Sequence, residues 1–207
     1  MELLLIRHGL PVRREVSEGI ADPELSAEGH QQARLLADYL SAERIDALYA
    51  SPLRRAIQTA QPLSELSGVA LGIEDGVAES DRDSSEYIPV EELKAADDPR
   101  WHAMVNDGYA LGAEGLREFH HRVVTSLEAV IDRHPGGKVA VACHAGVINV
   151  YLAHLLGVPL GAWVCHPGYT GIHRVIASRR GHRNVRTMNE TAHLRGSGLT
   201  IAPGWVG

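Results

Sequence analysis

Short apolar runs recur along the chain between charged or glycine-containing segments. Residues 3–6 and 138–143 have the composition of strands that are buried on both faces of a sheet. A shorter run at 46–50 predicts a further strand. Near the C-terminal end, 171–178 and 183–188 predict two strands joined by a turn.

Segments with apolar residues at helical spacing lie between these strands. Ser26 has the character of an N-cap, and Pro52 suits the first turn of a helix that continues to Leu63. A long amphipathic helix is predicted over 114–133, and another helix ends near Gly157. This alternation predicts an α/β fold, a three-layer sandwich with a mostly parallel central sheet and helices on both faces.

Residues 76–113 interrupt the alternation. The segment is rich in acidic residues and contains two prolines, Pro89 and Pro99. We interpret it as an inserted lid of short helices and loops within a single domain that spans residues 1–207.

The composition narrows the class of protein. The chain has 207 residues, 44% hydrophobic and 22% charged, as is typical of a soluble globular domain. A net charge of −6 argues against general binding to nucleic acid or to anionic membranes. The N-terminal apolar run is too short for a signal peptide, and no run reaches the roughly 18–20 residues of a membrane span. We expect a cytoplasmic protein.

Two histidines follow predicted buried strands directly, His8 after 3–6 and His144 after 138–143. Arg7 stands beside the first, and Arg55 lies at the start of the helix that follows 46–50. Ligands of open α/β sheets bind at the carboxyl ends of the strands, where the free N–H groups of a helix after His144 would also point. Two imidazoles and two guanidiniums at this edge predict a pocket for a tetrahedral anion such as phosphate.

The chain resembles the histidine phosphatase superfamily, also called phosphoglycerate mutase-like, and in particular its bacterial phosphatases. The resemblance runs in order along nearly the whole chain through the motifs LIRHG at 5–9, DPELSAEG at 22–29, SPLRRAIQTA at 51–60, VACHAGVI at 141–148 and NETAHL at 189–194.

The resemblance implies a role for each residue of the predicted pocket. His8 is the expected nucleophile, which forms a phosphohistidine, and its other ring nitrogen should donate to a backbone carbonyl. Arg7, Arg55 and His144 are expected to bind the phosphoryl oxygens and to stabilise the charge of the transition state. Because the arginines neutralise this charge, neither a metal nor another cofactor is expected.

The reaction also needs a carboxyl group that protonates the leaving oxygen and later activates water. In the family this group lies early in the insertion, where Glu79 is the best match, with Asp81 and Asp83 as the fallbacks. The alternative for Glu79 is that it belongs to a solvated acidic lid.

Three departures from the family pattern affect the site. Arg14 stands where many members have a phosphate-binding Asn, so it is either an added cation or a surface arginine. Ala145 replaces the first glycine of the usual His-Gly-Gly, which the anion site tolerates if this residue needs no positive φ. The lid also lacks the Gly-x-Trp-Glu-Gly pattern of many relatives, so substrate-contacting residues cannot be carried over.

The sequence therefore predicts a metal-independent phosphatase, a phosphoric monoester hydrolase of the histidine acid-phosphatase type, that acts on a small phosphorylated substrate through phospho-His8. Two alternatives are a phosphoglycerate-type mutase and a non-catalytic phosphate-binding or interaction module. The sequence does not determine the physiological substrate. It also does not determine the oligomeric state, for which a homodimer is one possibility.

Overall fold

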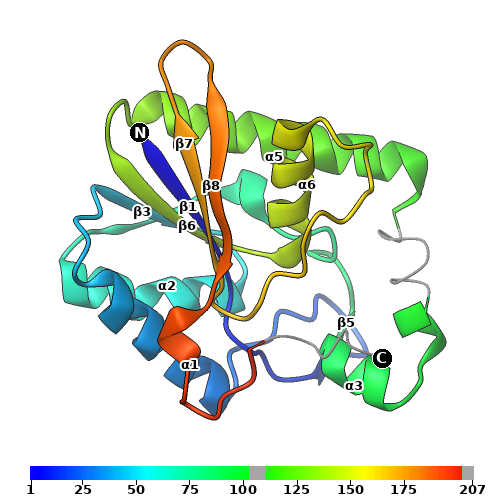
Figure 1. The fold of residues 1–207 in the computed structure, drawn as a ribbon. Helices are drawn as coiled ribbons and strands as arrows, with labels where there is room; N and C mark the ends of the chain where they lie inside the picture. Colours follow the sequence, from blue (N-terminus) through cyan, green and yellow to red (C-terminus); the bar gives the residue numbers. More distant parts are fainter. Residues whose placement is uncertain (103–110, 202–207) are drawn as a thin grey trace.

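A computed structural model describes residues 1–102 and 111–201 (Figure 1). Within them, six strands form one sheet in the order β4-β3-β6-β1-β7-β8. The strands are β1 (Glu2–Arg7), β3 (Ala47–Ala50), β4 (Leu71–Ile73), β6 (Lys138–Cys143), β7 (Ile172–Ala177) and β8 (Arg183–Glu190). The first four in chain order, β1, β3, β4 and β6, run parallel, and β7 is antiparallel to both β1 and β8. The prediction of a mostly parallel sheet is confirmed.

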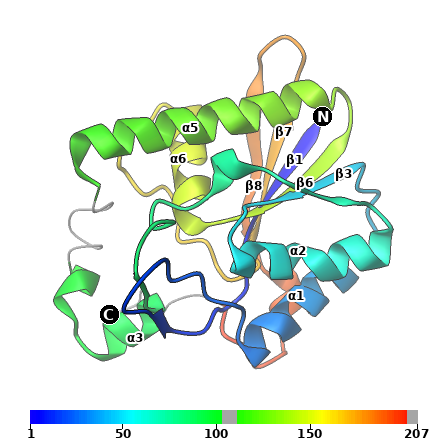
Figure 2. The same ribbon diagram turned by 180° about the vertical axis from the view of Figure 1, so that it is seen from behind.

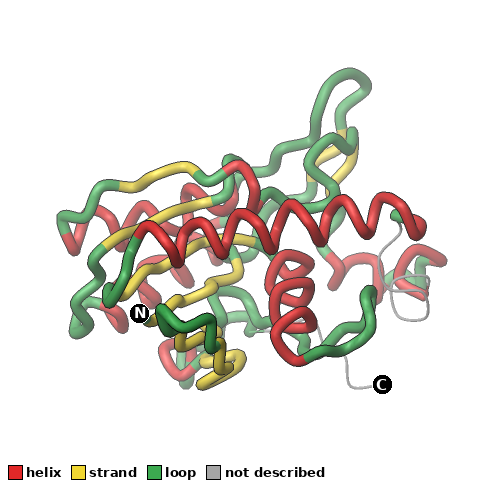
Figure 3. The backbone as a smooth tube through the Cα atoms, turned by 90° about the horizontal axis from the view of Figure 1, so that it is seen from above, coloured by secondary structure: helices red, strands yellow, loops and turns green. Residues whose placement is uncertain are grey.

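Helices cover both faces of the sheet (Figures 2 and 3). On one face lie α1 (Ala27–Leu40) and α2 (Arg54–Ser67), and on the other α5 (Gly112–Arg133) and α6 (Ala145–Leu156). The three-layer arrangement follows from the side chains of β1, which is buried on both sides. Leu3 and Leu5 pack with α5 and α6, whereas Leu4 and Ile6 pack with α1 and α2.

Two helix starts test the capping predictions. Ser26 caps α1 as expected, and its side chain accepts a hydrogen bond from the backbone N–H of Gly29 at 3.0 Å. The prediction for Pro52 was wrong by two residues, because α2 begins only at Arg54. The Asp22 carboxylate accepts a hydrogen bond from the Arg54 backbone N–H at 3.0 Å, so a distant residue fixes this start.

Within its described residues, the predicted lid, 76–113, consists of short helices and a short strand joined by loops. It includes the end of the short helix η1 (Asp75–Val77), the strand β5 (Glu86–Tyr87) and α3 (Val90–Ala95), while its residues 103–110 lie outside the described residues. Strand β5 pairs antiparallel with β2 (Arg14–Glu15), a contact that the sequence pattern did not indicate. The division into one domain with an inserted lid stays a prediction.

No helix in the two described ranges is both long and apolar enough to span a membrane.

Candidate active site

The carboxyl ends of β1, β3 and β6 bring four predicted residues together. We call Arg7, His8, Arg55 and His144 the strand-end cluster. Because β1 and β6 are paired neighbours, the imidazoles that follow them are close, with ring centroids 5.2 Å apart. All four side chains are buried, with residue exposures between 0% and 6%. Burying two guanidiniums is costly without partners, so the cluster is suited to receive an anion.

His8 is held in the tautomer that a nucleophile requires. Its Nδ1 donates a hydrogen bond to the carbonyl oxygen of Gly9 at 2.8 Å, so Nε2 carries the lone pair. Burial, Arg55 and Arg7 lower the pKa of His8, which keeps the ring neutral. Gly9 itself must be small, because a Cβ there would lie 2.8 Å from the backbone oxygen of Gly29. The predicted donation to a backbone carbonyl is confirmed.

His144 stands at the N-cap position of α6, with extended backbone angles of φ −132° and ψ 163°. Its Nε2 is 2.7 Å from the hydroxyl of Ser51, which follows β3, so two strand ends fix the ring. Burial and the charge of Arg55 lower the pKa of His144. Ala145 lies inside the helix and does not have a positive φ, so the condition under which an alanine is tolerated here is met.

Aromatic rings hold the two arginines of the cluster. The guanidinium carbon of Arg7 lies 4.0 Å from the ring centre of Tyr169, and Arg7 donates to the Pro167 carbonyl at 2.8 Å. Arg55 lies 4.7 Å from the ring centre of Tyr87 in β5. These stacking contacts fix the planes of both guanidiniums.

Three buried nitrogens of the cluster have no hydrogen-bond partner within the described part of the chain. They are Arg7 Nε, Arg55 Nε and His144 Nδ1. Unpaired buried polar groups are rare in native proteins and call for a ligand or a functional role. Oxygens of a phosphoryl group would satisfy N–H donors at these positions.

Two backbone hydrogen bonds hold the carboxylate of Glu79 beside the strand-end cluster. Its carboxylate accepts hydrogen bonds from the backbone N–H groups of Ser80 at 2.8 Å and of Gly146, in the first turn of α6, at 2.9 Å. A side chain at Gly146 would collide with this carboxylate, so a glycine is needed for the contact. Burial raises the pKa of Glu79, and the negative charge of Asp81 adds to the increase. A raised pKa is the direction that a carboxylic proton donor requires.

Arg122 of α5, which the sequence reasoning did not single out, fixes the segment before Glu79. Its Nη1 donates to the carbonyl oxygens of Gly76 and Ala78, both at 2.9 Å. At the sequence level Arg122 is one polar position of an amphipathic helix, and nothing in that pattern indicates this contact.

The other candidate residues, Asp81, Asp83 and Arg14, are more exposed than the strand-end cluster. Asp81 does not stand alone as an acid, because its Oδ1 is 3.0 Å from Nη2 of Arg55. Asp83 has a side chain that is 81% exposed and lies 3.9 Å from Arg82. Arg14 is exposed on β2, and its strand partner is Tyr87, whose ring packs on Arg55. Arg14 is therefore one side chain removed from the strand-end cluster.

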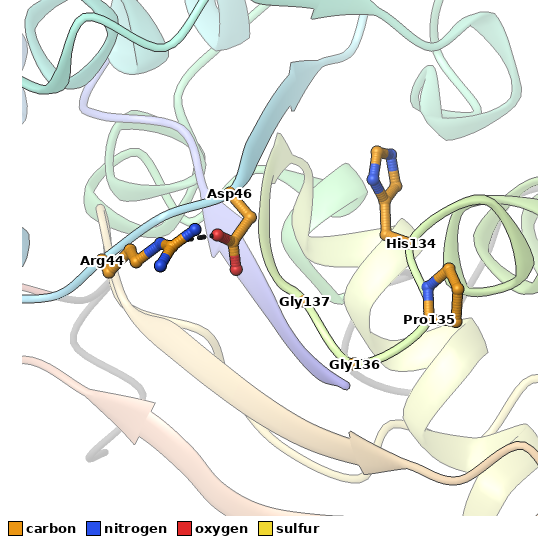
Figure 4. A pocket seen from close by; sticks show the side chains of 6 residues that line it. All are labelled: Arg44, Asp46, His134, Pro135, Gly136 and Gly137. Atoms are coloured by element: carbon orange, nitrogen blue, oxygen red, sulfur yellow. Dashed lines mark ion pairs between the residues drawn. The ribbon is translucent and has the colours of Figure 1, made fainter.

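A separate polar hollow lies where β3 and β6 begin, at the opposite edge of the sheet (Figure 4). Arg44 and Asp46 form an ion pair in it at 2.9 Å, and Nε2 of His134 is 2.8 Å from the Tyr49 hydroxyl. The charged groups and the imidazole of this hollow thus already have partners.

Comparison with known proteins identifies the family. The model of the histidine phosphatase superfamily, branch 1, matches residues 3–191. Phosphoserine phosphatase 1 of Hydrogenobacter thermophilus is 32% identical over 201 residues, which cover 94% of each chain. Phosphoglycerate mutase-like protein 4 of Arabidopsis thaliana is 29% identical over 157 residues, which cover 72% of this chain and 68% of that protein.

Two solved structures are similar to this chain over more than nine tenths of its length. The crystal structure of phosphoserine phosphatase from Entamoeba histolytica in complex with 3-phosphoglyceric acid has a TM-score of 0.71 and 25% identity, covering 93% of this chain and 98% of the other. Bacillus stearothermophilus YhfR has a TM-score of 0.74 at 22% identity, with 93% and 98% covered, and shows the same fold.

The chain belongs to the histidine phosphatase superfamily. The predicted family and fold are thereby confirmed, and the relatives support a phosphatase, with a mutase as the alternative.

Proposed function

We propose that the protein is a metal-independent phosphomonoesterase, of the histidine acid-phosphatase type, that works through a phosphohistidine on His8. The observation that carries this proposal is the neutral His8 with its Nε2 lone pair, 5.2 Å from the His144 ring and beside two buried guanidiniums with unpaired Nε groups. Such an arrangement places a nucleophile and its charge-stabilising groups in one dry site.

The reaction has two steps. In the first, His8 Nε2 attacks phosphorus while the bond to the leaving oxygen breaks, and Glu79 gives its proton to that oxygen. In the second, the Glu79 carboxylate takes a proton from water, whose oxygen attacks phosphorus while the P–N bond to His8 breaks and its electron pair returns to Nε2. The products are the alcohol and inorganic phosphate, and both His8 and Glu79 return to their starting states. Arg7, Arg55 and His144 hold the phosphoryl oxygens throughout.

The names of the relatives support a small phosphorylated substrate of the phosphoserine or 3-phosphoglycerate type. Arg14, exposed on the strand that pairs with Tyr87, is assigned an auxiliary role as a cation at the outer edge of the phosphate site. A cytoplasmic location belongs to the same proposal and can be checked by cell fractionation.

The first experiment measures hydrolysis of p-nitrophenyl phosphate with and without EDTA. We expect wild-type activity to survive chelation and His8→Ala to lose at least about 10⁴-fold in kcat, since nucleophile removal abolishes the covalent route. His182→Ala is the matched control, because His182 is exposed in the turn between β7 and β8.

Four outcomes contradict the proposal. Activity that EDTA removes would refute the metal-independent mechanism, and activity that His8→Ala retains would refute the phosphohistidine. Phosphate binding without any turnover would favour the binding module. Transfer of the phosphoryl group to an acceptor in preference to water would favour the mutase.

A further inference from the structure

Asp81 contacts the guanidinium that is proposed to bind phosphate. Its Oδ1 is 3.0 Å from Nη2 of Arg55, whose side chain is 2% exposed, whereas the Asp81 side chain is 37% exposed. The main chain at Asp81 is held in a turn, because the Asp81 carbonyl accepts a hydrogen bond from Ser84 N–H at 2.9 Å. Asp81 is thus an anion built into the edge of the site.

Arg55 cannot turn away from Asp81 at low cost. Its planar group lies under the Tyr87 ring at 4.7 Å, and its backbone is in the first turn of α2. The Nε of the same guanidinium is buried and has no partner in the described residues. One planar group therefore offers Nη2 to Asp81 and keeps Nε for another acceptor.

A phosphoryl group that accepts a hydrogen bond from Arg55 Nε shares one guanidinium with a carboxylate. The two anions are then separated by little more than the width of that group. Like charges this close repel, and the buried Arg55 side chain between them limits screening by water and salt although Asp81 is 37% exposed.

We propose that Asp81 is a resident counter-anion of the phosphate site that weakens the binding of phosphate and so speeds release of the product. This inference rests on the proposed function, in which inorganic phosphate is the product. It explains why a site with two buried arginines and two imidazoles need not retain a dianion: part of the positive charge of Arg55 is already neutralised.

The surrounding charges are consistent with this role. Glu79 is a carboxyl group that interacts with Asp81. The groups that interact with Glu79 include Arg55 of α2, Arg122 of α5 and the Cys143 thiol of β6, while Asp83 also acts on Arg122 and Glu91 acts with Asp81 on Tyr87. Asp81 contributes to the raised pKa of Glu79. Removing the charge of Asp81 is therefore expected to favour the ionised form of Glu79, which offsets part of the gain in phosphate binding without reversing it.

The test compares Asp81→Asn with Asp83→Asn by calorimetric titration with inorganic phosphate. Asparagine keeps an oxygen that can accept from Arg55 and removes only the charge. We expect Asp81→Asn to bind phosphate about three- to tenfold more tightly than wild type. Asp83→Asn makes the same change of charge on a side chain that is 81% exposed, and should stay within about twofold.

Equal or weaker phosphate binding by Asp81→Asn, or no difference from Asp83→Asn, would overturn the inference. A role limited to holding Arg55 in place predicts weaker binding, so tightening separates charge from structure. Asp81→Ala, which removes both charge and acceptor, is the second variant and should still bind more tightly than wild type.

Calorimetry needs no turnover, so the inference and the proposed function can fail separately. A protein that binds phosphate, tightens with Asp81→Asn and hydrolyses nothing would refute only the proposed function. A hydrolase whose affinity for phosphate is unchanged by Asp81→Asn would refute only the role of Asp81.

Discussion

The residues of the strand-end cluster are at most 6% exposed, whereas ion pairs between two residues of the lid lie largely in solvent. Arg100 and Glu86 in the lid, for example, pair at 2.9 Å with 48% of each side chain exposed. Exposed pairs contribute little to stability, about 0–1 kcal/mol, while buried groups are fixed by everything packed around them. The phosphate end of the site is therefore rigid, and the leaving-group end depends on weaker contacts.

The two regions also differ in what positions them. The register Arg7↔Cys143 between β1 and β6 sets His8 against His144, so the backbone of the sheet determines the phosphate site. In the lid, Glu79 is the exception, because Arg122 and the start of α6 hold its segment. The sheet thus fixes the phosphate site, while the lid, held by weaker contacts, is the part that can be adapted to a leaving group.

The largest expected difference is between a buried arginine of the strand-end cluster and an exposed arginine of β2, the strand that pairs with β5 of the lid. Arg55→Ala should lower kcat/KM for p-nitrophenyl phosphate about 10³-fold, because a preorganised donor to the transition state is lost. Arg14→Ala, which removes an exposed cation, should raise KM about threefold at most and leave kcat unchanged. Steady-state kinetics of both variants measure these effects. Comparable losses of kcat/KM would contradict the difference between buried and exposed arginines.

A second test compares packing. Leu5, fully buried in β1, should cost about 2–5 kcal/mol in the free energy of unfolding when changed to Ala. Leu93, the buried residue of α3, is 7% exposed in a short lid helix, and Leu93→Ala should cost about 1 kcal/mol. Urea denaturation measures both losses in the free energy of unfolding. Equal losses would mean that packing in the lid contributes as much to stability as packing in the sheet.

The third test concerns Glu79, the point where the two regions meet. Glu79→Gln should lower kcat/KM about 10²-fold for phosphoserine, whose alkoxide leaving group needs a proton, and less than tenfold for p-nitrophenyl phosphate. Equal losses for the two substrates would exclude Glu79 as the proton donor.

The same residue should determine a pH dependence. A general acid is active below its pKa, so a raised pKa extends activity upward. The basic limb of kcat/KM for phosphoserine should therefore lie above 4.5, the usual value for glutamate, and should be absent in Glu79→Gln. A limb that persists in this variant would belong to another group.

The sequence by itself determined the architecture and the phosphate end of the site. Its apolar runs located β1 and β6 to within one residue, and residues that directly follow such strands must meet at one edge of a parallel sheet. His8 and His144 could be predicted for this reason, and Arg7 and Arg55 with them. The tautomer of His8 follows from the same local geometry, since its partner is the next residue.

Only the tertiary structure decided what lies around this edge. The choice among Glu79, Asp81 and Asp83 depends on contacts such as that between Glu79 and Gly146, which are 67 residues apart. Two further contacts also join residues that are far apart in the sequence. They are the ion pair of Asp81 with Arg55 and the hydrogen bond from Arg122 to the Ala78 carbonyl. Hydrophobic periodicity indicates which face of a helix or strand is buried. Side-chain contacts between distant residues depend on how separate elements pack against each other, and that packing cannot be predicted from the periodicity of a single sequence.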